Sequence, residues 1–391
     1  MKRRQFISLP LPVLFLTLTS TVLASNTWYT DGVNGNDAND CQTALTACKT
    51  IGHAISLASS GDSIIVAAAT YTENLTIGIS LNVIGSGANT TIIDGGGVAT
   101  VVGIKSGTTV TLAGLTLRHG VVAFPVGYPG GLGWGAGIYN KGTLSVTAST
   151  ITENSISVDC RYSCRAEGGG IYNSAGAKLT ISNSTVAGNT VLAGNHNVES
   201  VAYADGGGIY NAGTMVMTNS TVAQNAAQHT AGVGFARGGG IWNGGSATIS
   251  NSTISGNSAL GGLAVQGGDI FTYPTNPVTL QNSIVANSSS GRNCVATITS
   301  KGYNLSSDNT CNFNGPGDRN NTNPMLGTFG YNGGPTQTIP LLSCSPAIDA
   351  GNPSGCRDAQ GNLLMTDQRG MPRPDPGDTG GCDIGAYESQ N

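Results

Sequence analysis

One position of this sequence, just before each glycine-rich repeat, carries residue types that can do chemistry. Aligned on the repeats, the column reads Trp134, Glu167, Asp205, Arg237 and Gln266. If successive repeats stack as parallel strands, Glu167 and Asp205 lie on neighbouring strands, about 4.8 Å apart at the backbone. Two carboxylates this close could form the acid/base and nucleophile pair of a retaining glycosidase. Arg237 could then orient a substrate carboxylate or stabilise developing charge.

A structural interpretation of the same column is simpler. Arg237 neutralises Asp205, and the column is then a ladder of paired, solvated charges. A polysaccharide lyase would also need calcium-binding acids on successive strands, and no acidic stack occurs outside this column. We therefore expect no catalytic residue, and keep Glu167, Asp205 and Arg237 as the enzymatic alternative. The four histidines are scattered and no phosphate loop or dinucleotide motif occurs, so we expect no metal and no cofactor.

A second column is aromatic and begins two residues into each repeat. Because the preceding isoleucine points inward, these rings are expected to point outward from a strand. A row of rings on a flat sheet could lie under a sugar chain, since aromatic faces suit the apolar faces of sugars. Alternatively, the rings pack against one another or lie under the segments that follow. The candidates for carbohydrate binding are Tyr139, Tyr172, Tyr210, Trp242 and Phe271.

Both columns depend on a repeat that reads Gly-Ile-aromatic-Asn. It occurs at Gly137–Asn140, Gly170–Asn173, Gly208–Asn211 and Gly240–Asn243, and a degenerate fifth copy contains Ile270 and Phe271. A second asparagine follows 14 to 16 residues after the first in each copy. A near-constant core joined by segments of variable length is typical of a solenoid. Short, β-branched strand patterns broken by Gly and Asn predict an all-β, single-stranded, right-handed parallel β-helix.

Equivalent asparagines should stack in such a coil and bond to one another and to the bent backbone. We expect two structural ladders. The first contains Asn140, Asn173, Asn211 and Asn243, and the second contains Asn154, Asn189, Asn225, Asn257 and Asn287. The variable segments all leave from one side of the coil and are interpreted as loops that form either a recognition face or unordered decoration. They are 156–167, 191–205, 226–237 and 259–266.

The remaining regions are assigned from composition and pattern. Residues 1–24 read as a signal peptide, because Lys2, Arg3 and Arg4 precede a short apolar stretch. Residues 25–62 form a turn segment and an amphipathic helix, expected at Thr50–Ser59, that caps the coil. The β-helix is assigned to 63–310 and a Pro/Gly-rich cap to 311–391. Charged residues make up only 10% of the chain and the net charge is −4, which disfavours nucleic acid as a partner.

The chain has nine cysteines, which in an exported protein indicate disulfides with one thiol left over. Local spacing favours four pairs and leaves Cys344 free, although sequence alone does not determine connectivity. The pairs are Cys41–Cys48, Cys160–Cys164, Cys294–Cys311 and Cys356–Cys382.

The C-terminal sequence carries the motifs that are most specific for a known protein family. It contains Asn332-Gly-Gly-Pro-Thr-Gln-Thr, then Ser-Pro-Ala-Ile-Asp-Ala-Gly ending at Gly351, Thr-Asp-Gln-Arg-Gly ending at Gly370, and Cys-Asp-Ile-Gly-Ala-Tyr-Glu ending at Glu388. Over 282–388 this resembles the choice-of-anchor Q domain of bacterial surface proteins. The central repeats resemble, at the level of fold, the β-helix repeats of that family, of pectate-lyase-like proteins and of polymorphic outer-membrane proteins.

This resemblance implies an exported bacterial protein whose tail closes the β-helix, and it brings no catalytic residues. Members of the family often carry a sorting segment after the last motif, whereas this sequence stops at Asn391. We therefore expect the protein to be released rather than anchored to the cell surface. The charged tail residues are expected to form a salt-bridged plug over the last coil, namely Asp349, Asp367, Arg369, Arg373, Asp383 and Glu388.

The sequence therefore predicts a monomeric, exported, non-enzymatic β-helix that binds carbohydrate or another cell-surface ligand through one face. Its expected location is extracellular or at the cell surface, with the periplasm as an alternative. The mature chain should have no membrane span. The competing hypotheses are a polysaccharide-degrading enzyme and a passive stalk.

Overall fold

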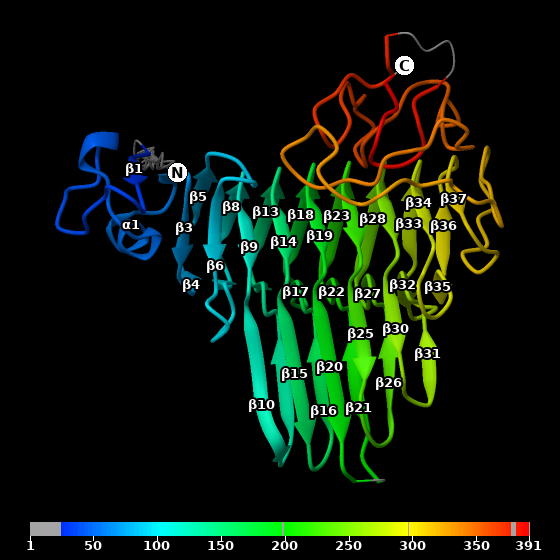
Figure 1. Cartoon of the computed structure of the whole chain (residues 1–391), viewed down its shortest axis with the longest axis horizontal. Helices are drawn as coiled ribbons and strands as arrows, with labels where there is room; N and C mark the ends of the chain where they lie inside the picture. The colour runs from blue at the N-terminus through cyan, green and yellow to red at the C-terminus, as the bar shows by residue number, and fades with distance from the viewer. Residues whose placement is uncertain (1–24, 198, 296, 377–380, 391) are drawn as a thin grey trace, which may run out of the picture.

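The computed structural model describes residues 25–197, 199–295, 297–376 and 381–390. The expected signal peptide lies outside these residues. Within them the chain forms a right-handed parallel β-helix, which confirms the predicted fold class, and each coil passes in turn through three parallel sheets (Figure 1). The described residues contain no helix long and apolar enough to cross a membrane.

Three sheets make the body of the β-helix. The ten-stranded sheet contains β1 (Thr27–Thr30), β2 (Ser63–Val66), β5 (Leu81–Gly85), β8 (Thr109–Ala113), β13 (Thr143–Thr147), β18 (Lys178–Ser182), β23 (Thr214–Thr218), β28 (Ser246–Ser250), β33 (Val278–Gln281) and β36 (Ile298–Ser300). The nine-stranded sheet contains β3 (Ala69–Thr72), β6 (Thr91–Asp94), β9 (Thr116–Arg118), β14 (Thr150–Thr152), β19 (Thr185–Ala187), β24 (Thr221–Ala223), β29 (Thr253–Ser255), β34 (Ile284–Ala286) and β37 (Leu305–Ser306). The eight-stranded sheet contains β4 (Leu75–Ile77), β7 (Val102–Ile104), β12 (Ile138–Asn140), β17 (Ile171–Asn173), β22 (Ile209–Asn211), β27 (Ile241–Asn243), β32 (Ile270–Thr272) and β35 (Cys294–Val295).

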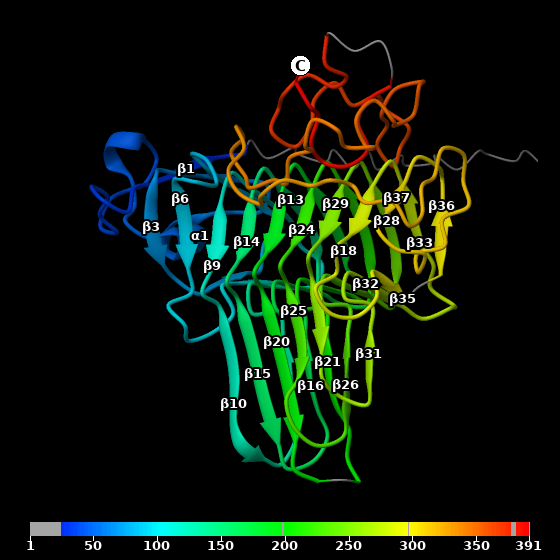
Figure 2. The same cartoon turned by 45° about the vertical axis from the view of Figure 1, so that its right-hand side comes forward.

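The four variable segments are not loops, which corrects the sequence-based interpretation. Each runs out from the body as one strand and returns as another. Together with a fifth such pair of strands, in residues 121–134, they build a fin that projects from the body (Figures 1 and 2). The outgoing sheet contains β10 (Val121–Tyr128), β15 (Ser155–Cys160), β20 (Thr190–Asn195), β25 (Ala226–His229) and β30 (Ser258–Leu260). The returning sheet contains β11 (Gly131–Trp134), β16 (Cys164–Glu167), β21 (Ala202–Asp205), β26 (Gly234–Arg237) and β31 (Ala264–Gln266).

Separate apolar cores hold the body and the fin. In the body, one isoleucine from each strand of the eight-stranded sheet points inward, as Ile138, Ile171 and Ile209 do, and all three are fully buried. The fin has its own core of smaller side chains, including Ile156, Val158 and Ala204. These residues alternate with exposed or half-buried ones along their strands, so the fin is a thin two-sheet sandwich.

A helix covers the N-terminal end of the body. It is α1 (Ile51–Leu57), preceded by a short 3₁₀ turn at Ala44–Thr46. Thr50 caps α1, because its hydroxyl accepts a hydrogen bond from the amide of His53. Ile51 and Ala54 are fully buried in the body core, so the helix shields the first coil from water as predicted, although it is shorter than expected.

The C-terminal region has two parts. Phe313 is buried in the core beyond the last strands, so the segment around it closes the end of the body. The chain then turns back and lies along the flank of the body (Figures 1 and 2). The Nδ2 of Asn219 donates to the carbonyl of Thr366 at 2.8 Å, and the Nδ2 of Asn251 donates to the carbonyl of Arg357 at 2.7 Å.

Four of the six charged tail residues form buried ion pairs, but not over the last coil, while Asp349 is exposed and, like Asp383, belongs to no ion pair among the described residues. Arg373 pairs with Glu388 at 2.7 Å, and Arg369 pairs with Asp367 at 2.8 Å. Arg373 also donates to the side chain of Asn219, which lies in the turn between β23 and β24. The expected plug is therefore a clamp on the flank. Its contacts with the body include Asn219 and Asn251, whose Nδ2 groups donate to carbonyl groups of the tail backbone.

Candidate functional site

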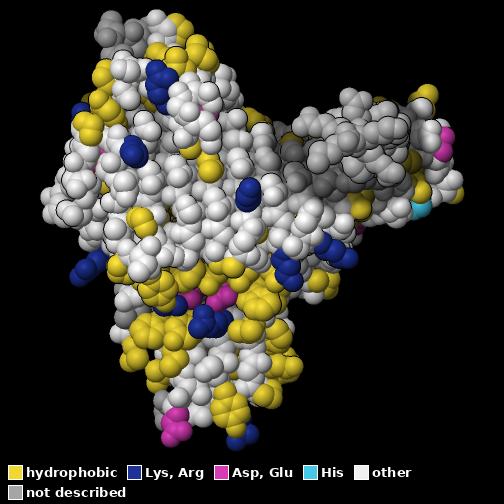
Figure 3. All heavy atoms as spheres, turned by 180° about the vertical axis from the view of Figure 1, so that it is seen from behind, with side chains coloured by type: hydrophobic (Ala, Val, Ile, Leu, Met, Phe, Trp, Pro, Cys, Tyr) yellow, Lys and Arg dark blue, Asp and Glu magenta, His cyan; other side chains and the backbone are white. Residues whose placement is uncertain are grey.

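The candidate site is the concave corner where the returning sheet of the fin meets the eight-stranded sheet of the body. We call it the corner, and its two walls are the columns predicted from sequence. A tight glycine turn joins the walls on each coil, as at Gly168, where φ is +70° and an added Cβ would lie 2.4 Å from the carbonyl oxygen of Ile171. Only glycine fits such a turn without strain. Figure 3 shows hydrophobic side chains gathered at this junction, with acidic and basic ones among them.

The fin wall carries the charged column in the predicted register. Trp134 pairs with Glu167, Glu167 with Asp205, Asp205 with Arg237, and Arg237 with Gln266. Asp205 is fully buried, and both of its carboxylate oxygens accept hydrogen bonds from Arg237, at 2.8 and 2.6 Å. Arg237 is held further by the hydroxyl of Tyr273, at 2.7 Å. Arg237 therefore neutralises Asp205, but the pair is bidentate and buried, whereas the structural interpretation of the column expected solvated charges.

Glu167 is also buried, at 4% exposure, but its partners differ. One carboxylate oxygen accepts from the guanidinium of Arg165 at 3.3 Å and the other from the indole N–H of Trp134 at 3.0 Å. Burial raises the pKa of Glu167, and the neighbouring carboxylate of Asp205 raises it further. Burial likewise raises the pKa of Asp205.

The body wall carries the aromatic column, again in the predicted register. Its central rings stack face to face: Tyr172 and Tyr210 are 4.9 Å apart, and Tyr210 and Trp242 are 4.1 Å apart, with interplanar angles of 3°. Tyr210, Trp242 and Phe271 are at most 7% exposed. Because the faces of these three rings are covered by neighbours, they stabilise the wall and offer no flat platform for a sugar.

The end of the corner formed by the first two fin coils is more open. Trp134, on the fin, lies 5.9 Å from Tyr139 and 5.8 Å from Tyr172, on the body, and all three are only half-buried. These three side chains span the corner from wall to wall. The open end therefore presents aromatic surface to solvent, whereas the other end is filled by Arg237 and the rings around it.

The fin wall has a second row of side chains that the sequence analysis did not identify. One step further from the turn lie Leu132, Arg165, Tyr203 and Phe235, which pair in register across the returning sheet. The guanidinium of Arg165 lies 4.6 Å from the ring of Tyr203, which stacks on Phe235 at 5.6 Å. The signal was present, because each of these residues stands two positions before the charged column, on the same face of a strand.

The first asparagine ladder is continuous. Asn140, Asn173 and Asn211 each donate from Nδ2 to the Oδ1 of the next asparagine, at 2.6 to 2.7 Å, and the last acceptor is Asn243. The second ladder runs from Asn154 through Asn189 and Asn225 to Asn257.

The second ladder does not end as predicted. Asn257 donates to Asp269 at 2.8 Å, and Asn287 is exposed and outside the ladder. The reason is register: Asn287 directly follows β34 and matches Gly256 of the preceding coil, with φ of +58° and +71°, so it stands one residue before the ladder position of Asn257. Burial raises the pKa of Asp269 well above its usual value, so its carboxyl can replace an asparagine amide as a neutral group.

Three of the four expected disulfides form in the described part of the chain: Cys41–Cys48, Cys294–Cys311 and Cys356–Cys382. Cys344 is an exposed free thiol. Cys160 and Cys164 are buried free thiols in the fin core, contrary to the prediction. Cys164 donates its S–H to the carbonyl of Gly194 at 3.0 Å, and burial raises its pKa, so the reactive thiolate is disfavoured.

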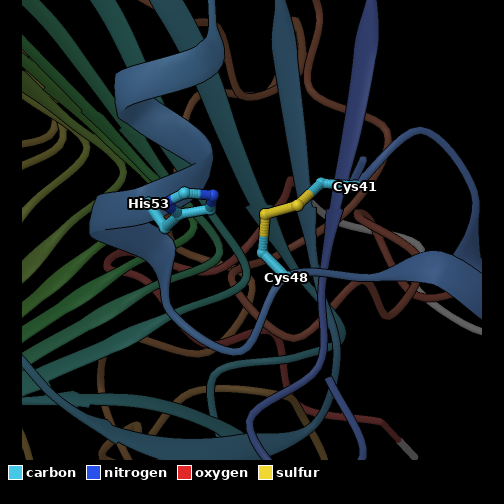
Figure 4. Close-up of side chains that lie close together, drawn as sticks. All are labelled: Cys41, Cys48 and His53. Atoms are coloured by element: carbon cyan, nitrogen blue, oxygen red, sulfur yellow. A yellow bond between two sulfur atoms is a disulfide. The ribbon is translucent and has the colours of Figure 1, made fainter. Parts of the chain in front are cut away.

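The described residues contain one cluster that has the composition of a metal site, formed by Cys41, Cys48 and His53. Figure 4 shows that the two sulfurs are joined to each other beside His53. A disulfide provides no thiolate for a metal, so these residues do not fit a metal ion.

Comparisons with known proteins bear on the fold. No protein-family model matches the sequence, and no curated protein matches it. Among solved structures, the chain is similar to pectate lyase Pel9A, with 15% identity, a TM-score of 0.41, and coverage of 95% of this chain and 98% of that one. It is also similar to the pectin methylesterase PemA from Erwinia chrysanthemi, with 12% identity, a TM-score of 0.35, and coverage of 71% and 81%. At these values the likeness adds nothing to the strand pairing described above, and it assigns no residue a role.

Proposed function

We propose that this protein is an exported, non-catalytic β-helix that binds a polysaccharide chain at the open end of the corner. The observation that carries the proposal is the arrangement of Trp134, Tyr139 and Tyr172, which are half-exposed and face one another across two walls. Rings with one polar edge and an apolar body suit a ligand whose surface is partly apolar and partly hydroxylated. Arg165 and Tyr203 extend this surface along the fin.

The carboxylates support binding better than catalysis. A retaining glycosidase needs one carboxylate free to attack and another free to transfer a proton. Both oxygens of Asp205 are bound by Arg237, and the side chain is fully buried. Glu167 has the raised pKa of an acid catalyst, but both of its oxygens are hydrogen-bonded and it is almost inaccessible.

We also propose that residues 282–388 form a choice-of-anchor Q domain and that the protein acts outside the cell. The motif residues support this proposal, because Asp367 pairs with Arg369 and Arg373 pairs with Glu388 inside the tail, and Arg373 also bonds to Asn219 of the body. The three disulfides among the described residues suit an oxidising compartment.

The test measures binding and turnover on the same samples. The secreted protein is run through native gels that contain a panel of plant and bacterial polysaccharides, and release of reducing ends is measured in parallel. We expect retardation by at least one polysaccharide, without product. Losing two half-exposed rings in Trp134→Ala/Tyr139→Ala should weaken binding by about 10-fold or more, since a central aromatic contact contributes about 1–2 kcal/mol.

The matched control is Tyr331→Ala, which removes a 57% exposed ring from the tail, and it should leave binding unchanged. Product release that disappears in Glu167→Gln would replace the proposal with the enzymatic alternative. No binding to any polymer would leave only a passive stalk. Equal binding by Trp134→Ala/Tyr139→Ala and the control would place the binding surface outside the corner and overturn the proposal.

A further inference from the structure

A row of lysines borders the open end of the corner, on the turn between the eight-stranded and ten-stranded sheets. Lys105 directly follows β7, Lys141 directly follows β12, and Lys178 begins β18, so the three stand on three successive coils. All three are exposed. We call them the lysine row.

The lysine row is not neutralised by the protein itself. Among the described residues, no carboxylate forms an ion pair with any of the three, whereas both acids of the corner are paired with arginines. Counting Arg165 and Arg237 with the row, five cations stand against Glu167 and Asp205. The corner and its border thus carry a local charge of +3 in a chain whose net charge is −4.

The row is continuous with the aromatic surface. The ammonium of Lys141 lies 4.6 Å from the centre of the Tyr139 ring, so a group that contacts this ring also meets a cation. Beside Lys141 is a hollow lined by hydroxyl side chains of Ser106, Thr108, Thr109 and Thr143. The hydroxyl of Thr108 donates to the carbonyl of Lys105 at 2.7 Å, which leaves Ser106, Thr109 and Thr143 as donors. Hydroxyl donors next to an ammonium without an acidic partner are groups that bind a carboxylate or a sulfate ester.

From this arrangement we infer that the ligand of the corner is an anionic polysaccharide, whose acidic groups lie on the lysine row while its sugar rings lie against Trp134, Tyr139 and Tyr172. The inference rests on the proposed function and adds the charge of the ligand. Lys105 and Lys141 occupy equivalent positions on neighbouring coils, about 4.8 Å apart at the backbone, whereas Lys178 lies further along the turn, in register with Thr143 of the preceding coil. The ammonium groups on their flexible stems can adapt to the spacing of charges along a polymer.

The experiment compares polymers that share a backbone and differ in charge. Carboxymethyl-cellulose is paired with hydroxyethyl-cellulose, and carboxymethyl-dextran with dextran, in titrations of the full secreted protein at low salt. We expect at least one anionic polymer to bind about 10-fold tighter than its neutral partner. This advantage should vanish at about 1 M NaCl, where charges are screened within about 3 Å.

Two double variants distinguish the contribution of the lysine row to binding from that of lysines elsewhere on the surface. Lys105→Gln/Lys141→Gln should lose about 3- to 10-fold in affinity for the anionic polymer, because each exposed ionic contact contributes about 0.2–1 kcal/mol. Lys49→Gln/Lys301→Gln removes two exposed lysines from elsewhere and should lose nothing.

Each other outcome has a definite meaning. Equal binding of a neutral polymer and its anionic partner overturns this inference and leaves the proposed function standing. Equal losses in the two lysine variants also overturn it. Binding of oligothymidylate as tight as that of carboxymethyl-cellulose would show attraction by charge alone and overturn the assignment to a polysaccharide. If the polysaccharide panel above and these polymers all fail to bind, the proposed function fails as well.

Discussion

Replacing Arg237 by methionine tests whether the charged column is held together as the structure indicates. The substitution leaves the carboxylate of Asp205 fully buried and without the two hydrogen bonds of 2.8 and 2.6 Å that now satisfy it. Breaking one partner of a buried ion pair typically costs about 3–5 kcal/mol, because the remaining charge is uncompensated. Arg237 also bonds to the hydroxyl of Tyr273, so we expect a loss in the upper part of this range.

Urea denaturation at pH 7, followed by tryptophan fluorescence, measures the change in the free energy of unfolding. The ring of Trp242 lies 6.4 Å from the ring of Phe271, and the guanidinium of Arg237 lies over that same phenylalanine ring. The emission of Trp242 should therefore report on this region. The matched control is the double variant Asp205→Leu/Arg237→Met, which removes both charges. Replacing a buried pair by apolar residues is often close to neutral, so this variant should recover most of the loss.

The pH dependence gives a second check on the same variant. Without Arg237, burial raises the pKa of Asp205 above its unfolded value even more strongly than it does in the native chain. The folded state then binds a proton that the unfolded state releases, so stability falls as pH rises and is regained as pH is lowered from 7 toward 4. A loss below about 1 kcal/mol in Arg237→Met, or a double variant as unstable as the single one, would refute the ion-pair account.

Three further predictions address the coil, the ladder and the tail. Gly168→Ala should lower the melting temperature far more than Gly176→Ala, because both positions have positive φ but only at Gly168 would a Cβ meet backbone within 3 Å. Asn211→Ala should destabilise the protein by about 2–4 kcal/mol in urea, since it leaves the Nδ2 of Asn173 and the Oδ1 of Asn243 without their ladder partners. Protection of the tail from protease should decrease from pH 5 to pH 8. Burial raises the pKa of Asp383 to about 6 and of Glu388 to about 7, and stability from such groups is lost as pH rises through these values.

The register in which strands of neighbouring coils pair was predictable, because the Gly-Ile-aromatic-Asn repeat determines it. The spacing between Ile138, Ile171, Ile209 and Ile241 is irregular in sequence, yet each must enter the same core, and a shift by one residue would turn it to solvent. Once the isoleucines are aligned, the charged and aromatic columns follow by counting. The same counting placed Asn140, Asn173, Asn211 and Asn243 in one ladder.

The orientation of the rings could not be obtained in this way. Register places Tyr210 above Tyr172, but whether their faces meet or point outward depends on what stands opposite them. The fin wall stands opposite these rings, and the segments that form it were interpreted from the sequence as loops. Each outgoing and returning strand of the fin has only three to eight residues, and its core is largely alanine, so its apolar alternation is weak.

The fin also explains why the two ends of the corner differ. At the end nearest the last fin coil, Arg237 reaches across to Phe271 and Tyr273, and the walls are in contact. At the first fin coil, Trp134 occupies the charged position, and the strands β10 and β11 have no fin strand on their outer side among the described residues. An indole has no charge to pair, and its single N–H bonds to Glu167, so its ring remains available. The substitution of one aromatic residue into a charged column therefore opens the corner at the end where the lysine row stands.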